Sequence, residues 1–313
     1  MHGNLCTAVF RRTSMLLIVN ENEPDTSTHT DEPIQEPARG RLVVGDARKV
    51  LAGMADKSFQ CCITSPPYWG LRDYGVDGQI GAEPTLEAYI EDLVALFREV
   101  RRTLRDDGTL WLNIGDGFTS GGRTWRAPDK KNKGRAMEYR APTPDGLKPK
   151  DLIGVPWRLA IALQADGWYL RADIIWQKPN CQPESVKDRP TRSHEYVFLL
   201  TKSERYYYNS DAVKELTADG KHTKNRRSVW AINTEPYGGN HFAVFPTELV
   251  RLCMEAGSKK EEVVLDPFFG SGTVGQVARD NGRKFVGIEL SPDYAELARK
   301  RLASKSNSRK LQR

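Results

Sequence analysis

The stretch Asp266-Pro267-Phe268-Phe269-Gly270-Ser271-Gly272-Thr273-Val274-Gly275 decides the predicted fold. Apolar residues precede it and a helix-forming sequence follows it, so the stretch predicts a strand-to-helix turn. Its glycines allow the backbone to approach a ligand closely. They have the G-x-G-x-x-G spacing of a nucleotide-binding turn, and Glu289 ends the next predicted strand, where an acid can bind ribose hydroxyls. The spacing alone therefore favours a nucleoside cofactor over a plain tight turn.

Outward from this turn, predicted strands and helices alternate along the chain. Strands are expected at residues 41–44, 58–63, 109–114, 171–176, 195–201, 263–265 and 284–290. Helices are expected at about residues 86–104, 156–166, 246–256, 273–281 and 292–303, and 106–108 is expected to form a turn. This alternation predicts an α/β fold, a Rossmann-like and mostly parallel sheet with helices on both faces.

Composition narrows the class of protein. The chain has 313 residues, and 47 basic against 41 acidic side chains give a net charge of +6, which is compatible with a polyanionic partner. The scattered cysteines lack zinc or disulfide spacing, so no metal site is expected, and Cys61 and Cys62 should be small core residues. No apolar run approaches the roughly 20 residues of a membrane helix. We expect a cytoplasmic protein without a membrane partner.

A second motif, Thr64-Ser65-Pro66-Pro67-Tyr68, directly follows the predicted strand 58–63. Adjacent prolines cannot continue a central strand, so the chain must turn there. The Ser65 hydroxyl and the Pro66 carbonyl can each accept a hydrogen bond, and the prolines hold both oxygens in place. Such a pair of acceptors suits an amine whose lone pair must be released from conjugation, and Tyr68 offers a ring for stacking.

Ser65-Pro66-Pro67-Tyr68 resembles the catalytic motif of the DNA amino-methyltransferases, and the segment 266–272 resembles their cofactor motif. The catalytic motif comes first, as in the permuted β-class of that family, and the resemblance covers roughly residues 41–303. It implies the class I methyltransferase fold, S-adenosylmethionine as cofactor, and duplex DNA with the target base rotated out of the helix. It makes Ser65, Pro66, Pro67 and Tyr68 the catalytic residues.

The resemblance also implies a set of cofactor-binding residues. Asp266 should accept hydrogen bonds from the ammonium group of the cofactor, which a dinucleotide lacks, and a carboxylate would be unwelcome beside a pyrophosphate. Asp46 could approach the adenine or lie in an ordinary turn, and Phe245 could contact the methionine end or belong to the core. The expected set is Asp46, Phe245, Asp266, Pro267, Phe268, Gly270, Gly272, Thr273 and Glu289.

The target base and the DNA contacts are less well determined. Serine in the first motif position is typical of cytosine-N4 enzymes, whereas Asp or Asn is typical of adenine-N6 enzymes, so cytosine is favoured. Trp176, Lys178 and Asn180 belong to a segment resembling the border of the base pocket, although Trp176 could equally be core. His194-Glu195 resembles a family element that precedes a strand, and we do not expect its histidine to be catalytic.

The domain organisation follows from local composition. Residues 1–40 are expected to form a disordered leader, 41–303 the catalytic domain, and 304–313 a basic tail. Two irregular basic stretches, 117–150 and 203–240, are candidate DNA-recognition insertions or solvated loops. Arg226 and Arg227, in the second stretch, could contact phosphates or guanine.

Several alternatives stay open at this point. An NAD-type oxidoreductase leaves the residues 65–68 and Asp266 unexplained, and intact motifs argue against an inactive DNA-binding module. RNA or a protein amide in the site would more usually have Asn in place of Ser65. A restriction endonuclease partner, and a monomer or a homodimer, are all compatible with the sequence.

Overall fold

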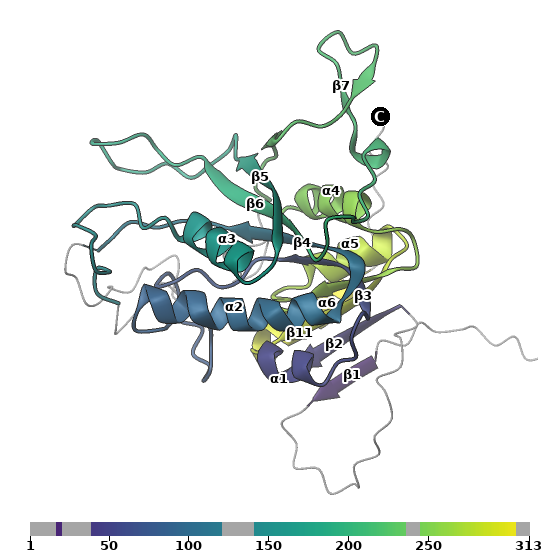
Figure 1. The fold of residues 1–313 in the computed structure, drawn as a ribbon, viewed down its shortest axis with the longest axis horizontal. Helices are drawn as coiled ribbons and strands as arrows, with labels where there is room; N and C mark the ends of the chain where they lie inside the picture. The colour runs from purple at the N-terminus through teal and green to yellow at the C-terminus, as the bar shows by residue number, and fades with distance from the viewer. Residues whose placement is uncertain (1–16, 21–38, 121–140, 236–244, 305–313) are drawn as a thin grey trace, which may run out of the picture.

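The structure is a computed structural model that describes residues 17–20, 39–120, 141–235 and 245–304. Within these residues a nine-stranded sheet has the order β1-β2-β11-β10-β3-β4-β6-β5-β9 (Figure 1). Its strands are β1 (Leu17–Asn20), β2 (Gly40–Val44), β3 (Phe59–Thr64), β4 (Leu104–Ile114), β5 (Tyr169–Gln177), β6 (His194–Thr201), β9 (Val229–Ala231), β10 (Val263–Asp266) and β11 (Lys284–Glu289). The helices are α1 (Ala47–Ala52), α2 (Leu86–Thr103), α3 (Val155–Ala165), α4 (Thr247–Gly257), α5 (Thr273–Asp280) and α6 (Pro292–Ala303).

The strand directions place one functional edge on the sheet. Strands β1, β2, β11, β10, β3 and β4 pair in parallel, whereas β6 is antiparallel to both β4 and β5, and β9 is parallel to β5. The chain leaves β10 towards β11 but leaves β3 towards β4, so the connections diverge between β10 and β3. Ligands of such sheets bind at this kind of switch point, beyond the carboxyl ends of the strands. The predicted α/β fold is confirmed.

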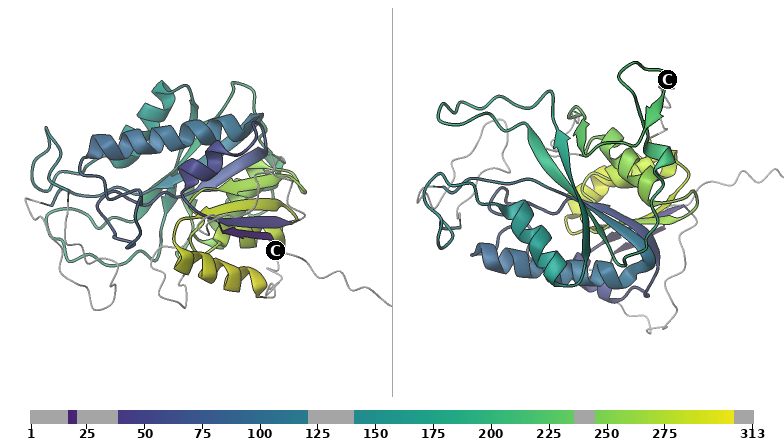
Figure 2. Two further views of the ribbon diagram at one scale, coloured as in Figure 1. Left: turned by 90° about the horizontal axis from the view of Figure 1, so that it is seen from below. Right: turned by 45° about the horizontal axis from the view of Figure 1, so that its top comes forward.

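Two cores lie on opposite faces of the sheet, because neighbouring residues of a strand point to opposite sides. Val43 and Cys62 pack with helices α1, α2 and α3, whereas Leu42, Cys61 and Ile63 pack with α4, α5 and α6 (Figure 2). Cys61 and Cys62 are fully buried and free, as expected for small core residues. The strands are apolar on both faces because helices cover both faces.

The predicted leader is wrong at its only described part before the domain. Leu17–Asn20 forms β1, an edge strand that pairs in parallel with residues 41–44 of β2. Its apolar and β-branched residues suit a strand, although the run is too short to reveal that partner by itself. The segments 1–16 and 21–38, like 305–313 of the predicted basic tail, lie outside the described residues.

The expected turn at residues 106–108 is also wrong, because these residues belong to β4. The pairing of β3 with β4 shifts register between Phe59 and Cys61, so β4 accommodates a local irregularity there. A Cβ atom at Gly108 would lie 2.9 Å from the carbonyl oxygen of Arg105, so this irregular strand needs a glycine at that position.

The stretch 203–240 is more ordered than its composition predicts. It contains a short 3-10 helix, η2 (Asp211–Val213), a hairpin of β7 (Glu215–Leu216) and β8 (Thr223–Lys224), and strand β9 of the main sheet. Trp230 of β9 is 3% exposed, and its ring lies 6.3 Å from that of Trp111. The prediction that this stretch merely interrupts the core is therefore wrong for β9.

The other predicted insertion, 117–150, is described only at its two ends. Residues 117–120 and 141–150 contain turns and one isolated bridge, from Phe118 to Leu152, and residues 121–140 lie outside the described part. Among the described helices, none combines the length and apolarity needed to cross a membrane.

Gly287, in the middle of β11, should not tolerate a side chain. A Cβ atom there would lie 2.2 Å from the ring of Phe269, which belongs to the glycine-rich turn. We expect Gly287→Ala to reduce the free energy of unfolding by about 1–3 kcal/mol, through overpacking. Urea unfolding measures this change. In the control Gly53→Ala, the new Cβ approaches nothing closer than 3.7 Å, so its midpoint should match wild type. Equal midpoints for all three proteins would contradict the packing described here.

Candidate functional site

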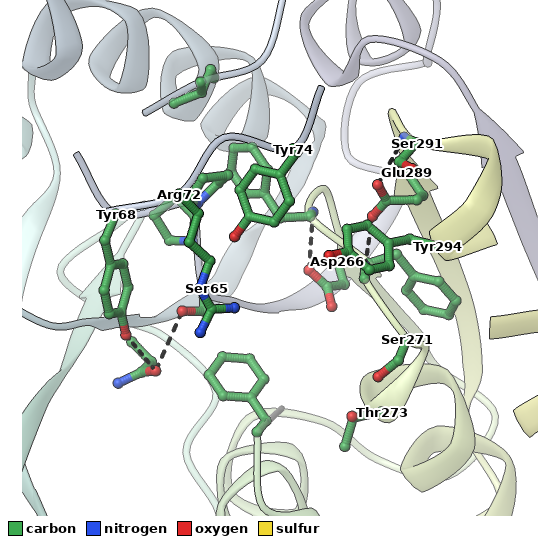
Figure 3. A pocket seen from close by; sticks show the side chains of 18 of the residues that line it. Ser65, Tyr68, Arg72, Tyr74, Asp266, Ser271, Thr273, Glu289, Ser291 and Tyr294 are labelled. Atoms are coloured by element: carbon green, nitrogen blue, oxygen red, sulfur yellow. Dashed lines mark hydrogen bonds between the residues drawn. The ribbon is translucent and has the colours of Figure 1, made fainter. Parts of the chain in front are cut away.

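A cavity of about 840 Å³ opens at the carboxyl ends of the parallel strands. Its lining comes from the residues that follow β2, β3, β5, β10 and β11, together with a segment at residues 71–80. Figure 3 shows Ser65 and Tyr68 on one side of this cavity and Asp266, Glu289 and Tyr294 on the other. Arg72 and Tyr74 lie between the two groups, so both predicted motifs contribute to one site.

The glycine-rich turn forms one side of the cavity. Gly270 and Gly272 have φ angles of 51° and 80°, in the left-handed region that favours glycine. Glu289 fixes the turn, because its Oε2 accepts a hydrogen bond from the Gly270 amide at 2.7 Å and its Oε1 accepts one from the Ser291 amide at 2.9 Å. The turn is thus bound to the end of the next strand by a carboxylate that itself faces the cavity.

Asp266 is the most strongly perturbed carboxylate of the site. It is 3% exposed, and its Oδ1 accepts hydrogen bonds from Thr64 Oγ1 at 2.7 Å and from the Phe268 amide at 3.1 Å. Burial raises the pKa of Asp266 to about 7, and the negative charge of Glu289 adds to the rise while the two hydrogen bonds oppose it. Burial also raises the pKa of Glu289. Two buried acids in one cavity favour a cationic ligand.

Asp46 lines the cavity but also has a structural role. It is the N-cap of α1, where its side chain accepts a hydrogen bond from the Arg48 amide at 2.9 Å, and it pairs with the Arg48 guanidinium at 2.8 Å. Burial acts to raise the pKa of Asp46, but the hydrogen bonds from Arg48 outweigh it and hold that pKa below its usual value. Arg48 also donates to the carbonyl oxygen of Gly78 at 3.0 Å, so Asp46 helps to anchor the segment over the cavity.

On the opposite side, Asn113 organises the catalytic turn. The Ser65 hydroxyl donates to Asn113 Oδ1 at 3.4 Å, and the Tyr68 hydroxyl lies 3.4 Å from the same oxygen. Asn113 Nδ2 donates to Glu195 Oε2 at 3.2 Å and to the carbonyl oxygen of Tyr196 at 3.0 Å. Because two acceptors bind the amide nitrogen, the amide oxygen must face Ser65.

Glu195 connects this group to Lys178. Its Oε2 accepts a hydrogen bond from the Tyr68 hydroxyl at 2.9 Å, and its Oε1 forms an ion pair with Lys178. The Lys178 ammonium lies 4.2 Å from the ring centre of Trp176. Trp176 is buried and also lines the cavity, so both interpretations of this residue hold.

Most of the residues predicted for the site come together in the cavity. Those that line it are Asp46, Ser65, Pro66, Pro67, Tyr68, Trp176, Lys178, Asn180, Phe245, Asp266, Pro267, Phe268, Gly270, Thr273 and Glu289. Gly272 does not line it but is the N-cap of α5. Of the element expected to contact the cofactor's methionine end, residues 241–244 lie outside the described part.

Arg226 and Arg227 are not brought to the cavity. Arg226 Nε donates to the carbonyl oxygen of Val213 at 2.8 Å, and Arg227, which is 73% exposed, pairs with Glu215 at 3.4 Å. Both precede the amino end of β9, whereas the carboxyl end of that strand leads to the cavity lining. The structure thus separates these arginines from the site.

Several lining residues were missed from the sequence, namely Arg72, Tyr74, Asn113, Glu195 and Tyr294. Asn113 carried a recognisable signal, because it is a polar residue near the end of a buried strand, and it is 3% exposed. Tyr74 and Tyr294 meet edge to face with ring centres 5.8 Å apart, a contact between distant segments that no local pattern predicts. His194 and Glu195 are the first residues of β6 and do not precede it.

Comparisons with known proteins agree with this geometry. Residues 59–300 match the N6_N4_Mtase family model, described as DNA methylase. The Type II methyltransferase M.SmaI of Serratia marcescens is 64% identical over 285 residues, which cover 90% of this chain and 98% of that protein. The Type II methyltransferase M.Cfr9I of Citrobacter freundii is 60% identical over 274 residues, covering 88% and 91%.

Solved structures share the fold. The PvuII DNA methyltransferase (cytosine-N4-specific) has a TM-score of 0.64 at 20% identity, covering 87% of this chain and 89% of that one. A DNA modification methylase from Thermus thermophilus, TTHA0409, solved in complex with S-adenosyl-L-methionine, has a TM-score of 0.59 at 29% identity, covering 84% and 93%. The first of these likenesses establishes the class I methyltransferase fold alone.

The raised pKa of Asp266 predicts a pH-dependent cost to the ligand-free protein. An acid whose pKa is higher in the folded state than in the unfolded state lowers stability as pH rises from about 4 to about 7. Asp266→Asn keeps an oxygen for Thr64 and Phe268 and removes the charge. We expect it to increase the free energy of unfolding relative to wild type at pH 8, by up to about 4 kcal/mol, but much less at pH 4.5. Chemical denaturation at both pH values measures this. An equal effect at pH 4.5 and pH 8 would contradict the assigned pKa.

Proposed function

Because this chain belongs to the N6/N4 DNA methylase family, we propose that it transfers a methyl group from S-adenosylmethionine to the exocyclic N4 amine of cytosine at a specific site in duplex DNA. One observation carries the proposal. The catalytic turn and the glycine-rich turn share a single cavity, and the hydrogen bond from Thr64 to Asp266 joins the strands that bear them.

The acids of the glycine-rich side suit the proposed methyl donor. When bound, S-adenosylmethionine supplies a methyl group on a cationic sulfonium. Asp266 would accept hydrogen bonds from the ammonium group, and Glu289 would accept them from the ribose hydroxyls. Both acids are buried and have raised pKa values, so a cationic ligand would favour their ionised forms. The relative solved with this cofactor supports the assignment.

The Ser65 side suits an amine. Ser65 has one hydroxyl hydrogen, and its donation to Asn113 leaves the lone pairs of the oxygen available to the cavity. Ser65 Oγ and the Pro66 carbonyl oxygen would then accept the two hydrogens of the target amine. This favours the pyramidal amine, whose lone pair can attack. Because the acceptors are fixed before the substrate binds, little reorganisation is needed during reaction.

Ser65 is also the reason for favouring cytosine over adenine. A hydroxyl reaches less far than the carboxylate or amide oxygen that is typical of adenine-N6 enzymes in this position. The alternative, adenine-N6 methylation, keeps the same cofactor and the same attack by an exocyclic amine. The two activities therefore differ in product and not in the architecture of the cavity.

The DNA contacts follow from the sheet edge at which the cavity opens. Residues 117–150 begin just after the carboxyl end of β4, on the cavity edge, so we propose that this basic stretch contacts DNA. Residues 203–227 begin after β6, which runs in the opposite direction, and we assign Arg226 and Arg227 no contact with the target base. The unit 41–303 would act in the cytoplasm as a monomer or homodimer, alongside a restriction endonuclease of the same specificity.

Product analysis tests the proposal. The protein is incubated with labelled S-adenosylmethionine and duplex DNA, and the DNA is digested to nucleosides. We expect labelled N4-methylcytosine. Ser65→Ala should bind the cofactor as wild type does but transfer the methyl group about 10²–10³-fold more slowly, because one amine acceptor is lost. Asp266→Ala should lose cofactor binding.

Three outcomes would contradict these expectations in different ways. N6-methyladenine as the product would retain the family and remove the cytosine assignment. Absence of transfer to any duplex by a protein that binds the cofactor would remove DNA as the substrate. Tight cofactor binding by Asp266→Ala, measured by titration calorimetry, would remove the role assigned to that carboxylate.

A further inference from the structure

We propose that Lys178, held in place by Glu195, donates hydrogen bonds to ring atoms N3 and O2 of the target cytosine, and so determines which base the site accepts. This inference rests on the proposed cytosine-N4 function and assigns the recognition of the base to an ion pair on the cavity wall. Lys178 and Glu195 both line the cavity.

The Lys178 ammonium is held inside the cavity from several directions. It forms an ion pair with Glu195 and lies over the ring of Trp176 at 4.2 Å, a favourable cation–π distance. Trp176 is itself fixed, because its Nε1 donates to the carbonyl oxygen of Ile232 at 2.9 Å. The Lys178 amide donates to the carbonyl oxygen of Ser193 at 2.7 Å, and the side chain is 17% exposed. An ordinary surface lysine would extend into solvent.

Glu195 joins this cation to the catalytic turn. Its other carboxylate oxygen accepts hydrogen bonds from the Tyr68 hydroxyl at 2.9 Å and from Asn113 Nδ2 at 3.2 Å. Asn113 in turn accepts the hydrogen of Ser65. A continuous chain of hydrogen bonds therefore runs along one wall, with acceptors for an amine at its Ser65 end and a cationic donor at its Lys178 end.

This order of acceptor and donor matches one edge of cytosine. The Watson–Crick edge of cytosine presents the amine, which donates, followed by N3 and O2, which accept. The ammonium of lysine has three N–H donors, and the described structure commits one of them to Glu195. Adenine presents its amine and N1, but a C–H group takes the place of O2. A buried N–H without an acceptor is costly, so the same wall would disfavour adenine.

Glu195 also keeps the net charge of this wall close to zero. The attacking amine nitrogen gains positive charge as it bonds to the methyl carbon, and an uncompensated lysine nearby would oppose that change. The carboxylate of Glu195 offsets the ammonium while leaving its remaining N–H groups able to donate. The simpler alternative is that this ion pair only joins the ends of β5 and β6. That alternative predicts no dependence on the atoms of the base.

A double cycle separates the two interpretations. Lys178→Met and wild type are compared on the duplex that wild type modifies, with the target either cytosine or 3-deazacytosine, which has C–H in place of N3. The intrinsic reactivity of the two bases cancels in the cycle. We expect Lys178→Met to reduce kcat/KM on cytosine about 10–100-fold, and the loss caused by 3-deazacytosine to be at least about tenfold smaller in the variant than in wild type.

Two further variants sharpen the test. Lys187→Met changes an exposed lysine of the same segment and should show no coupling to the base change. Glu195→Gln keeps an acceptor for Tyr68 but loses the charge that holds Lys178, so kcat should fall and the coupling should shrink. The dissociation constant of the cofactor should stay as in wild type in all three variants. If Lys178→Met does not fold, the Glu195→Gln cycle decides.

The outcomes distinguish this inference from the function on which it rests. Strictly independent losses from Lys178→Met and from 3-deazacytosine would overturn the inference, while formation of N4-methylcytosine by wild type would leave the proposed function standing. N6-methyladenine as the sole wild-type product would overturn both.

Discussion

The hydrogen bond from Thr64 Oγ1 to Asp266 Oδ1 is the interaction on which the site depends. It spans 202 positions of sequence but only 2.7 Å, because β3 and β10 are neighbours in the sheet. Both partners are buried and end their strands at the point where the connections diverge. The bond thus aligns the turn that bears Ser65 with the turn that bears the glycines. It also keeps the pKa of Asp266 lower than burial alone would allow.

From that junction the cavity extends in two directions with different chemistry. Towards β11 the lining is acidic, with Asp266 and Glu289 buried and ready to oppose a cation. Towards β4, β6 and β5 it is a hydrogen-bonded wall in which Asn113 and Glu195 orient the groups that would face a base. Methyl transfer needs a cationic donor and a neutral amine side by side, and the switch point of the sheet provides both environments at one place.

The local motifs were predictable from sequence, but the partners that orient them were not. The glycine turn, the double-proline turn and most helices follow from spacing and residue type, and the structure confirms them. Asn113 and Glu195 become site residues only because β6 runs antiparallel between β4 and β5, a pairing that no local pattern specifies. The same limit explains two wrong predictions. Residues 17–20 find a strand partner beyond the predicted leader, and the basic residues Arg226 and Arg227 lie away from the cavity that their composition suggested.

The pH dependence of cofactor binding in Thr64→Val tests this account most directly. Asp266 must be ionised to bind an ammonium group, so wild-type affinity for S-adenosylmethionine should rise as pH increases through about 7. Valine matches threonine in shape but donates no hydrogen bond, so the pKa of Asp266 should rise further and the midpoint of this dependence should move to higher pH. The same midpoint in both proteins would contradict the central role given to the bond between the two strands.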